Sequence, residues 1–265
     1  MMKDITMGQY YPEKSILHDL DPRMKIVLLF FYMILIFFVK TFYGFLFIAI
    51  ITYLMIKGSH LPVRLFLKSL RPVLVIISFT LFLHAFFTKG GEVLLALGPL
   101  TIESAGLITG LFMTLRLMIL VITTSLLTLT TSPIALTDGI EYLLSPLKKV
   151  GVPAHELAMM MTISLRFIPI LILESDKIMK AQLARGADFN RGNVVERARN
   201  MVPLIVPLFV SAFRRADELA TAMEARGYRG GEGRTRLNIL RLSPRDFHAL
   251  TFVVIVFVLV LATGL

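Results

Sequence analysis

Five apolar stretches alternate with polar loops along this chain. They cover residues 26–39, 42–56, 73–88, 105–130 and 248–265. A membrane-crossing helix needs about 20 apolar residues. The first two stretches are short, but Lys25, Lys40 and Lys57 flank them and extend their effective length by snorkelling. The pattern predicts an all-α, polytopic membrane protein with about five transmembrane helices.

Lysine and arginine are unevenly distributed among the loops. Four of them precede the first stretch, four lie between the second and third, and many lie between the fourth and fifth, but only Lys40 and Lys89 occupy the other two loops. Cytoplasmic loops carry the basic excess. We therefore expect a multi-pass protein of the cell membrane with its N-terminus in the cytoplasm. The polar, mixed-charge N-terminus lacks the pattern of a signal peptide, so the first span should stay in the mature protein.

Composition supports this interpretation. Apolar residues make up 56% of the chain and charged residues 17%, whereas soluble domains have about 45–50% and about 25%. The net charge of +10 is explained by orientation in the bilayer, which leaves nucleic-acid binding a poor second interpretation. Because the chain has no cysteine, it has no disulfide and no thiolate metal site.

Residues 131–247 are too long for a simple loop and too apolar for a linker. Two apolar runs, at 156–173 and 201–213, each pass directly into a charged helical pattern. They predict two long helices that are apolar at the start and amphipathic at the end. Whether their apolar halves enter the bilayer or lie on it stays open at this point. The resulting division is 1–130 with four spans, 131–247 with the long helices, and 248–265 with the last span.

These two helices carry an internal repeat with an offset of 41 residues. Asp176 aligns with Asp217, and the pattern D-x4-A-x-x-A-R-G ends in Ala184-Arg185-Gly186 and in Ala225-Arg226-Gly227. Glycine just past the last turn adopts the left-handed conformation that ends a helix. Arginine there complements the helix dipole and presents a guanidinium that binds carboxylates or carbonyls. A single copy is an ordinary helix end, but two matched copies indicate either two copies of whatever the motif contacts or two equivalent sites on a dimer.

At these motifs the chain resembles a known family. The segments LRFIPILILESDKIMKAQLARGADF (165–189), SILHDLDPRMKIVLLF (15–30) and AMEARGYRG (222–230) are similar to the transmembrane T component of energy-coupling factor (ECF) transporters, importers of vitamins and other micronutrients. The resemblance covers nearly the whole chain.

The resemblance implies a complex with two ABC-type ATPase subunits and one substrate-binding S component. Each Ala-Arg-Gly tip would dock in one ATPase, and the crossing coupling helices, with Asp176 and Asp217 in support, would hold the S component. ATP would be bound by the ATPases, because this chain lacks the G-x4-G-K-[ST] phosphate loop. The resemblance implies no catalytic residue, metal or cofactor here, and it places substrate choice in the S component.

Other chemistry is weakly indicated. Arg116 lies inside the fourth stretch, where an ionisable residue is costly; we favour a structural role facing the protein interior or capping carbonyls. Arg166 either snorkels or pairs with Glu174. His18, Asp19 and Asp21 suggest a metal cluster, but Asp21 before Pro22 fits a helix cap better.

The remaining alternatives are a secondary transporter, which would need polar groups at the bilayer midplane, and a membrane-bound enzyme, for which catalytic groups are missing.

Overall fold

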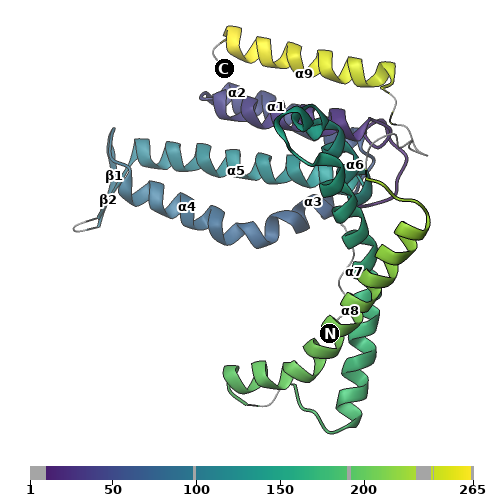
Figure 1. Ribbon diagram of the computed structural model, residues 1–265. Helices are drawn as coiled ribbons and strands as arrows, with labels where there is room; N and C mark the ends of the chain where they lie inside the picture. Colours follow the sequence, from purple (N-terminus) through teal and green to yellow (C-terminus); the bar gives the residue numbers. More distant parts are fainter. Residues whose placement is uncertain (1–9, 98–99, 190–191, 231–239, 241, 264–265) are drawn as a thin grey trace. The chain divides into compact units, whose positions relative to one another are not determined.

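The computed structural model describes residues 10–97, 100–189, 192–230, 240 and 242–263. Its elements are almost entirely helical, as expected (Figure 1). The contacts divide the chain into two units, and each is described by itself. The bundle unit comprises the described residues from 10 to 139 and from 240 to 263. The helix-pair unit comprises those from 140 to 230.

The bundle unit contains the elements that correspond to the five apolar stretches. In chain order they are α1 (Pro22–Phe38), α2 (Phe42–Gly58), α3 (Val63–Leu70), the 3-10 turn η1 (Arg71–Val73), α4 (Leu74–Phe87), β1 (Val93–Leu97), β2 (Leu100–Glu103), α5 (Ser104–Thr130), the first part of α6 (Pro133–Leu144), and α9 (Pro244–Thr263). The short antiparallel β1–β2 hairpin between α4 and α5 was not predicted from the sequence. The predicted third span begins earlier than expected, because α3 and η1 lead into α4 through Pro72.

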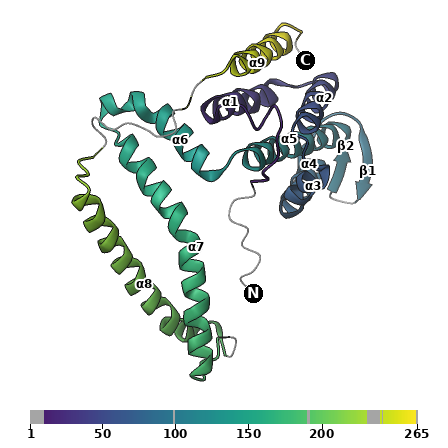
Figure 2. The ribbon, with the colours of Figure 1, turned by 90° about the vertical axis from the view of Figure 1, so that its right-hand side faces the viewer.

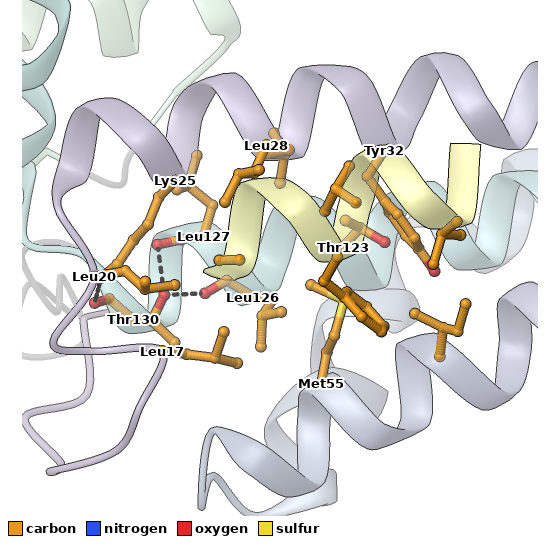
Figure 3. A pocket seen from close by; sticks show the side chains of 16 residues that line it. Leu17, Leu20, Lys25, Leu28, Tyr32, Met55, Thr123, Leu126, Leu127 and Thr130 are labelled. Atoms are coloured by element: carbon orange, nitrogen blue, oxygen red, sulfur yellow. Dashed lines mark hydrogen bonds between the residues drawn. The ribbon is translucent and has the colours of Figure 1, made fainter. Parts of the chain in front are cut away.

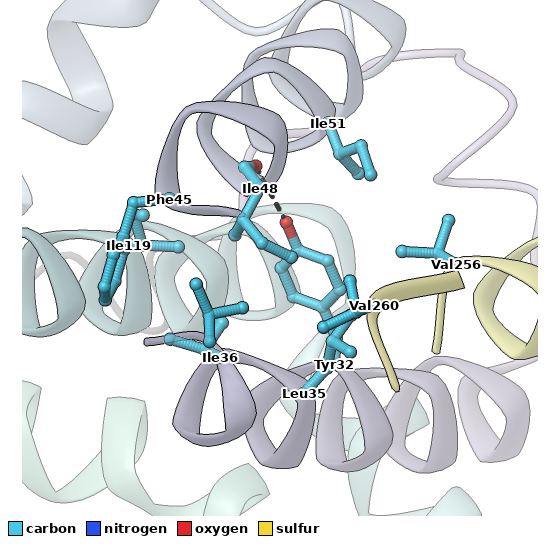
Figure 4. Close-up of a cluster of buried hydrophobic side chains, with 10 residues drawn as sticks. Tyr32, Leu35, Ile36, Phe45, Ile48, Ile51, Ile119, Val256 and Val260 are labelled. Atoms are coloured by element: carbon cyan, nitrogen blue, oxygen red, sulfur yellow. Dashed lines mark hydrogen bonds between the residues drawn. The ribbon is translucent and has the colours of Figure 1, made fainter. Parts of the chain in front are cut away.

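The core of the bundle unit lies where α1, α2, α5 and α9 meet (Figure 4). Tyr32 of α1 stands at its centre, and its hydroxyl group contacts the Ile48 carbonyl oxygen at 3.1 Å and the Thr52 hydroxyl group at 2.8 Å. Buried polar groups need such partners in an apolar environment. Leucine, isoleucine and valine side chains surround the ring, with Leu35 and Ile36 fully buried.

Helices α4 and α5 pack closely because α5 has glycines at the contact. A Cβ atom at Gly106 would lie 2.6 Å from the carbonyl oxygens of both His84 and Thr88. Gly110, four residues later, faces Leu81 and the Cβ atom of His84 at 3.1 Å. Small residues spaced in this way let transmembrane helices approach each other. The G-x-x-x-G signal in 106–110 is visible in the sequence.

A buried carboxylate joins the starts of α1 and α9. Asp246 is 1% exposed, and it accepts hydrogen bonds from the Asp21 amide at 2.8 Å and from the Ser243 amide at 2.6 Å. Asp21 itself caps α1 by accepting from the Arg23 amide at 2.9 Å, and it pairs with the Arg23 side chain. The predicted capping role of Asp21 is confirmed. Among the described residues, no cluster of three or more His, Asp or Glu side chains could hold a metal ion.

The helix-pair unit consists of the end of α6, the 3-10 helix η2 (Ser145–Val150), α7 (Ala154–Ala184) and α8 (Val194–Ala225). Asn193 and Glu196 form a capping box at the start of α8. The two long helices of the repeat therefore exist as predicted, each longer than 30 residues. Pro169 lies within α7, and Pro203 and Pro207 lie within α8, where each removes one backbone hydrogen bond.

Within the residues that the structure describes, four helical segments are long and apolar enough to cross a membrane. They are Val63–Phe87, Ser104–Thr130, Ala154–Ala184 and Pro244–Thr263, and Phe42–Gly58 is a shorter apolar helix. These segments confirm a polytopic helical membrane protein. By length and composition α7 is also able to cross, so its apolar half is compatible with entry into the bilayer.

Candidate functional site: the paired helix tips

Helices α7 and α8 end in the same local structure. In both, the glycine after the arginine has a positive φ, +88° for Gly186 and +75° for Gly227. The next residue closes a six-residue turn: the Ala187 amide donates to the Gln182 carbonyl oxygen, and the Tyr228 amide donates to the Met223 carbonyl oxygen, both at 3.0 Å. This is the Schellman arrangement, which satisfies carbonyl groups left free at a helix end. The predicted glycine caps are confirmed at both tips.

The two arginines also have the same backbone conformation, with φ and ψ of −87° and 5° at Arg185 and −86° and 6° at Arg226. Both side chains are exposed. In the described part of the chain, neither guanidinium forms a hydrogen bond or an ion pair. Each tip therefore presents a cation with five unused donors on a defined helix end.

The tips point in different directions because α7 and α8 are antiparallel. Only nine residues, 185–193, connect them, and Figures 1 and 2 show α8 returning along α7 and crossing it. At the crossing, Arg215 Nη2 lies 3.2 Å from Glu174 Oε2. Ser175, beside Glu174, is the buried residue in the second half of α7.

The crossing pair has the same offset as the repeat, since 174 plus 41 is 215. Equivalent residues of two copies of a helix meet only near the axis that relates the copies, and for two crossing, antiparallel helices that axis is approximately two-fold. The repeat thus forms a pseudo-two-fold pair with its axis close to Glu174 and Arg215. Ala184 and Ala225 each lie ten residues beyond the crossing on their own helix, which is about 15 Å at 1.5 Å per residue.

Asp176 and Asp217, the two residues predicted to support the coupling helices, lie on α7 and α8. Asp176 is half-buried and Asp217 is exposed, and neither carboxylate has a hydrogen bond or ion pair within the described residues. From the sequence, Arg166 on the same helix was instead a candidate partner of Glu174. The structure pairs Glu174 with Arg215 of α8, the residue at the equivalent position of the repeat.

The start of α7 is anchored to α6. His155 Nδ1 lies 2.9 Å from Glu141 Oε1, across the η2 connection. Ala154 and Ala158 are buried beside this contact. The anchor holds the base of α7, whereas the Arg185 end extends away from it.

Most of the apolar surface of the two helices is uncovered. Leu204 is the buried residue of α8, and α7 buries only Ala154, Ala158 and Ser175. The exposed large apolar side chains are Leu157, Met160, Met161, Ile168, Leu173 and Leu183 on α7, and Val194, Val195, Met201, Val202, Ile205, Val206, Phe209, Val210 and Phe213 on α8. Apolar surfaces of this extent belong to a protein partner or to lipid.

Arg116 has a structural role, as favoured from the sequence. Its Nη2 donates to the Val39 carbonyl oxygen at 2.9 Å, at the end of α1. The guanidinium also lies 5.5 Å from the Phe37 ring centroid and 5.7 Å from that of Phe45. A carbonyl at a helix end and two aromatic faces stabilise a cation inside a bundle.

A cavity of about 140 Å³ lies between α1, α2, α5 and α9 (Figure 3). Its lining is almost wholly apolar, and its polar groups are occupied. Lys25 Nζ donates to the carbonyl oxygens of His18 and Thr130 and to the Thr131 hydroxyl group, at 3.0 to 3.3 Å. All three ammonium donors of Lys25 are therefore used within the protein.

Comparisons with known proteins agree with the resemblance. A family model described as "CbiQ: Cobalt transport protein" matches residues 13–237. The chain is 56% identical over 248 residues to the energy-coupling factor transporter transmembrane protein EcfT of Thermosediminibacter oceani, covering 94% of this chain and 93% of that protein. The EcfT proteins of Clostridium kluyveri and Bacillus subtilis are 55% and 47% identical over 250 and 246 residues, covering 94% and 93% of this chain and 93% of each relative.

Proposed function

This chain belongs to the EcfT family of energy-coupling factor transporter transmembrane proteins, and we propose that its two arginine tips each dock in one of two ABC-type ATPase subunits. The chain is the transmembrane, non-catalytic component of such a transporter. It has no phosphate loop, so ATP is bound by the partner subunits.

The pseudo-two-fold relation of the tips carries this proposal. A pair of equivalent ATPase subunits presents two equivalent surfaces, and a two-fold element contacts both in the same way. Arg185 and Arg226 have matching cap geometry and free donors, on helices that cross at Glu174 and Arg215. Rigid helix ends transmit a displacement of a bound subunit to the rest of the helix.

The uncovered apolar faces of α7 and α8 provide the second half of the mechanism. We assign them to a substrate-binding S component, because they are large, contain flexible methionines at 160 and 161, and continue into the tip-bearing segments. Movement of the tips on ATP binding then shifts the surface that holds the S component. The distribution of basic residues supports a cytoplasmic N-terminus and cytoplasmic tips.

Charge reversal at the tips tests the docking role. Co-expressed with its partners, the R185E/R226E variant is expected to lose the two ATPase subunits on purification, while the wild-type chain retains them. The matched control is K40E/K89E, which makes the same total charge change at two exposed lysines, one after α1 and one after α4. Retention of both ATPases by R185E/R226E would overturn the docking proposal. Uptake by the isolated chain in liposomes without ATP would instead support a secondary transporter.

A further inference from the structure

The short helix α3 and the 3-10 turn η1 that follows it carry an unusual cationic stripe. Arg64, Lys68 and Arg71 follow one another at intervals of four and three residues, so they lie on one face, and all three are exposed. Lys57, in the last turn of α2, is also exposed and lies near the start of α3 in the chain. The result is four cations in 15 residues, from 57 to 71.

Two further faces of α3 fix its orientation. Phe66 is 1% exposed and packs with Ile56, Leu61, Leu126 and Leu129, so this face is held against the bundle. Val63 and Leu67 lie one turn apart beside the cationic stripe, and they are 52% and 61% exposed. Helix α3 therefore presents an uncovered apolar stripe and an uncovered cationic stripe side by side.

No acidic residue neutralises the cationic stripe from nearby in the chain. The sequence contains neither Asp nor Glu from residue 22 through residue 91. Where the structure describes the chain, the side chains of Lys57, Arg64, Lys68 and Arg71 form no ion pair or hydrogen bond. The charge balance must therefore come from outside this part of the molecule.

We propose that α3 and Lys57 bind the headgroups of anionic phospholipids at this end of the bundle. An anionic lipid supplies both complements at once: its phosphate pairs with the guanidinium and ammonium groups, and its acyl chains cover Val63 and Leu67. An acidic protein surface would match the cations but leave the apolar stripe exposed. Basic residues next to a membrane span attract anionic lipid in this way.

The test compares lipid binding to the purified full-length chain. Phosphatidylglycerol and phosphatidylcholine are titrated separately, and bound lipid is counted by native mass spectrometry. The variant R64Q/K68Q is expected to bind phosphatidylglycerol on the order of 25-fold more weakly, since each cation near a lipid surface contributes about a fivefold factor. Phosphatidylcholine binding should be unchanged.

The matched control is K40Q/K89Q, which removes two lysines at the opposite end of α2 and α4 and should keep wild-type phosphatidylglycerol affinity. The variant R64K/K68R keeps both charges and should also behave as wild type, which separates charge from folding. Equal phosphatidylglycerol affinity for R64Q/K68Q and the wild type would overturn the proposal. An unchanged lipid affinity together with loss of a co-purified protein would assign the stripe to an acidic protein surface instead.

Discussion

Glu174 and Arg215 occupy equivalent positions of a 41-residue repeat, and their side chains meet at 3.2 Å where α7 crosses α8. Two identical residues across a two-fold axis would place like charges together. Because the two copies lie in one chain, the two positions can carry different residues, and here they carry opposite charges. The opposite charges stabilise the crossing from which both arginine tips extend.

Exchanging these charges tests the two-fold relation. The variants E174R and R215E each place like charges at the crossing, and each should reduce stability by about 1 kcal/mol, because the pair is partly solvent-exposed. The double variant E174R/R215E restores opposite charges in the same geometry. It should recover both the melting temperature and ATP-dependent uptake, measured in nanodiscs and in proteoliposomes. A double variant worse than either single variant would contradict the isologous contact.

The positive φ angles of Gly186 and Gly227 predict how alanine at these positions affects the helix ends. A Cβ atom at Gly186 or Gly227 meets no atom within 4 Å, so alanine there is opposed by the positive φ and not by a clash. G186A and G227A should each destabilise the local helix end by about 1–2 kcal/mol and weaken co-purification of the ATPase subunits. Asparagine at either position should have a smaller effect. The control is G58A, at a helical glycine of α2 with equally open space, which should be neutral or stabilising. Equal effects of G58A and G186A would argue against the cap.

The Asp246 joint predicts a large effect on stability. The variant D246A leaves the buried Asp21 amide without its acceptor, and it should lower the free energy of unfolding by about 2–3 kcal/mol. Thermal unfolding in detergent measures the change. The comparison is D19N, which removes the exposed pair between Asp19 and Arg245 and should cost less than about 1 kcal/mol. Equal melting temperatures for D246A and D19N would show that Asp246 does not hold the starts of α1 and α9 together.

Membrane orientation is tested by labelling, since the chain contains no cysteine. A single cysteine at Lys40 should react with an impermeant maleimide on intact cells, because the α1–α2 turn is expected outside. A single cysteine at Lys180, on the exposed face of α7, should react only after permeabilisation. Labelling of the Lys180 position on intact cells would reverse the proposed topology.

The helices were largely predictable because apolar periodicity and length decide them in a membrane protein. The caps at Asp21, Gly186 and Gly227 were predictable because each depends on local backbone chemistry. The partner of Glu174 was not found, because helical spacing favours neighbours on the same helix and the crossing depends on tertiary packing. The β1–β2 hairpin was also missed, since residues 93–103 lack the alternation of a half-buried sheet.

For Arg116, the sequence predicted a structural role but not the group that its side chain binds. Its position inside a span, with no acidic residue in the other spans, favoured a structural interpretation. The Val39 carbonyl oxygen that it caps belongs to a helix 77 residues away in sequence. Only the fold brings the two together.

Photo-crosslinking at the tips tests the central claim most directly. The assembled transporter would carry benzoylphenylalanine in place of Ala184 or Ala225, both exposed, and in place of exposed Lys89 as the control. We expect each tip position to form a covalent adduct with an ATPase subunit, identified by mass spectrometry, and Lys89 to form none. An intact, ATP-hydrolysing complex in which neither tip crosslinks to an ATPase would contradict the account.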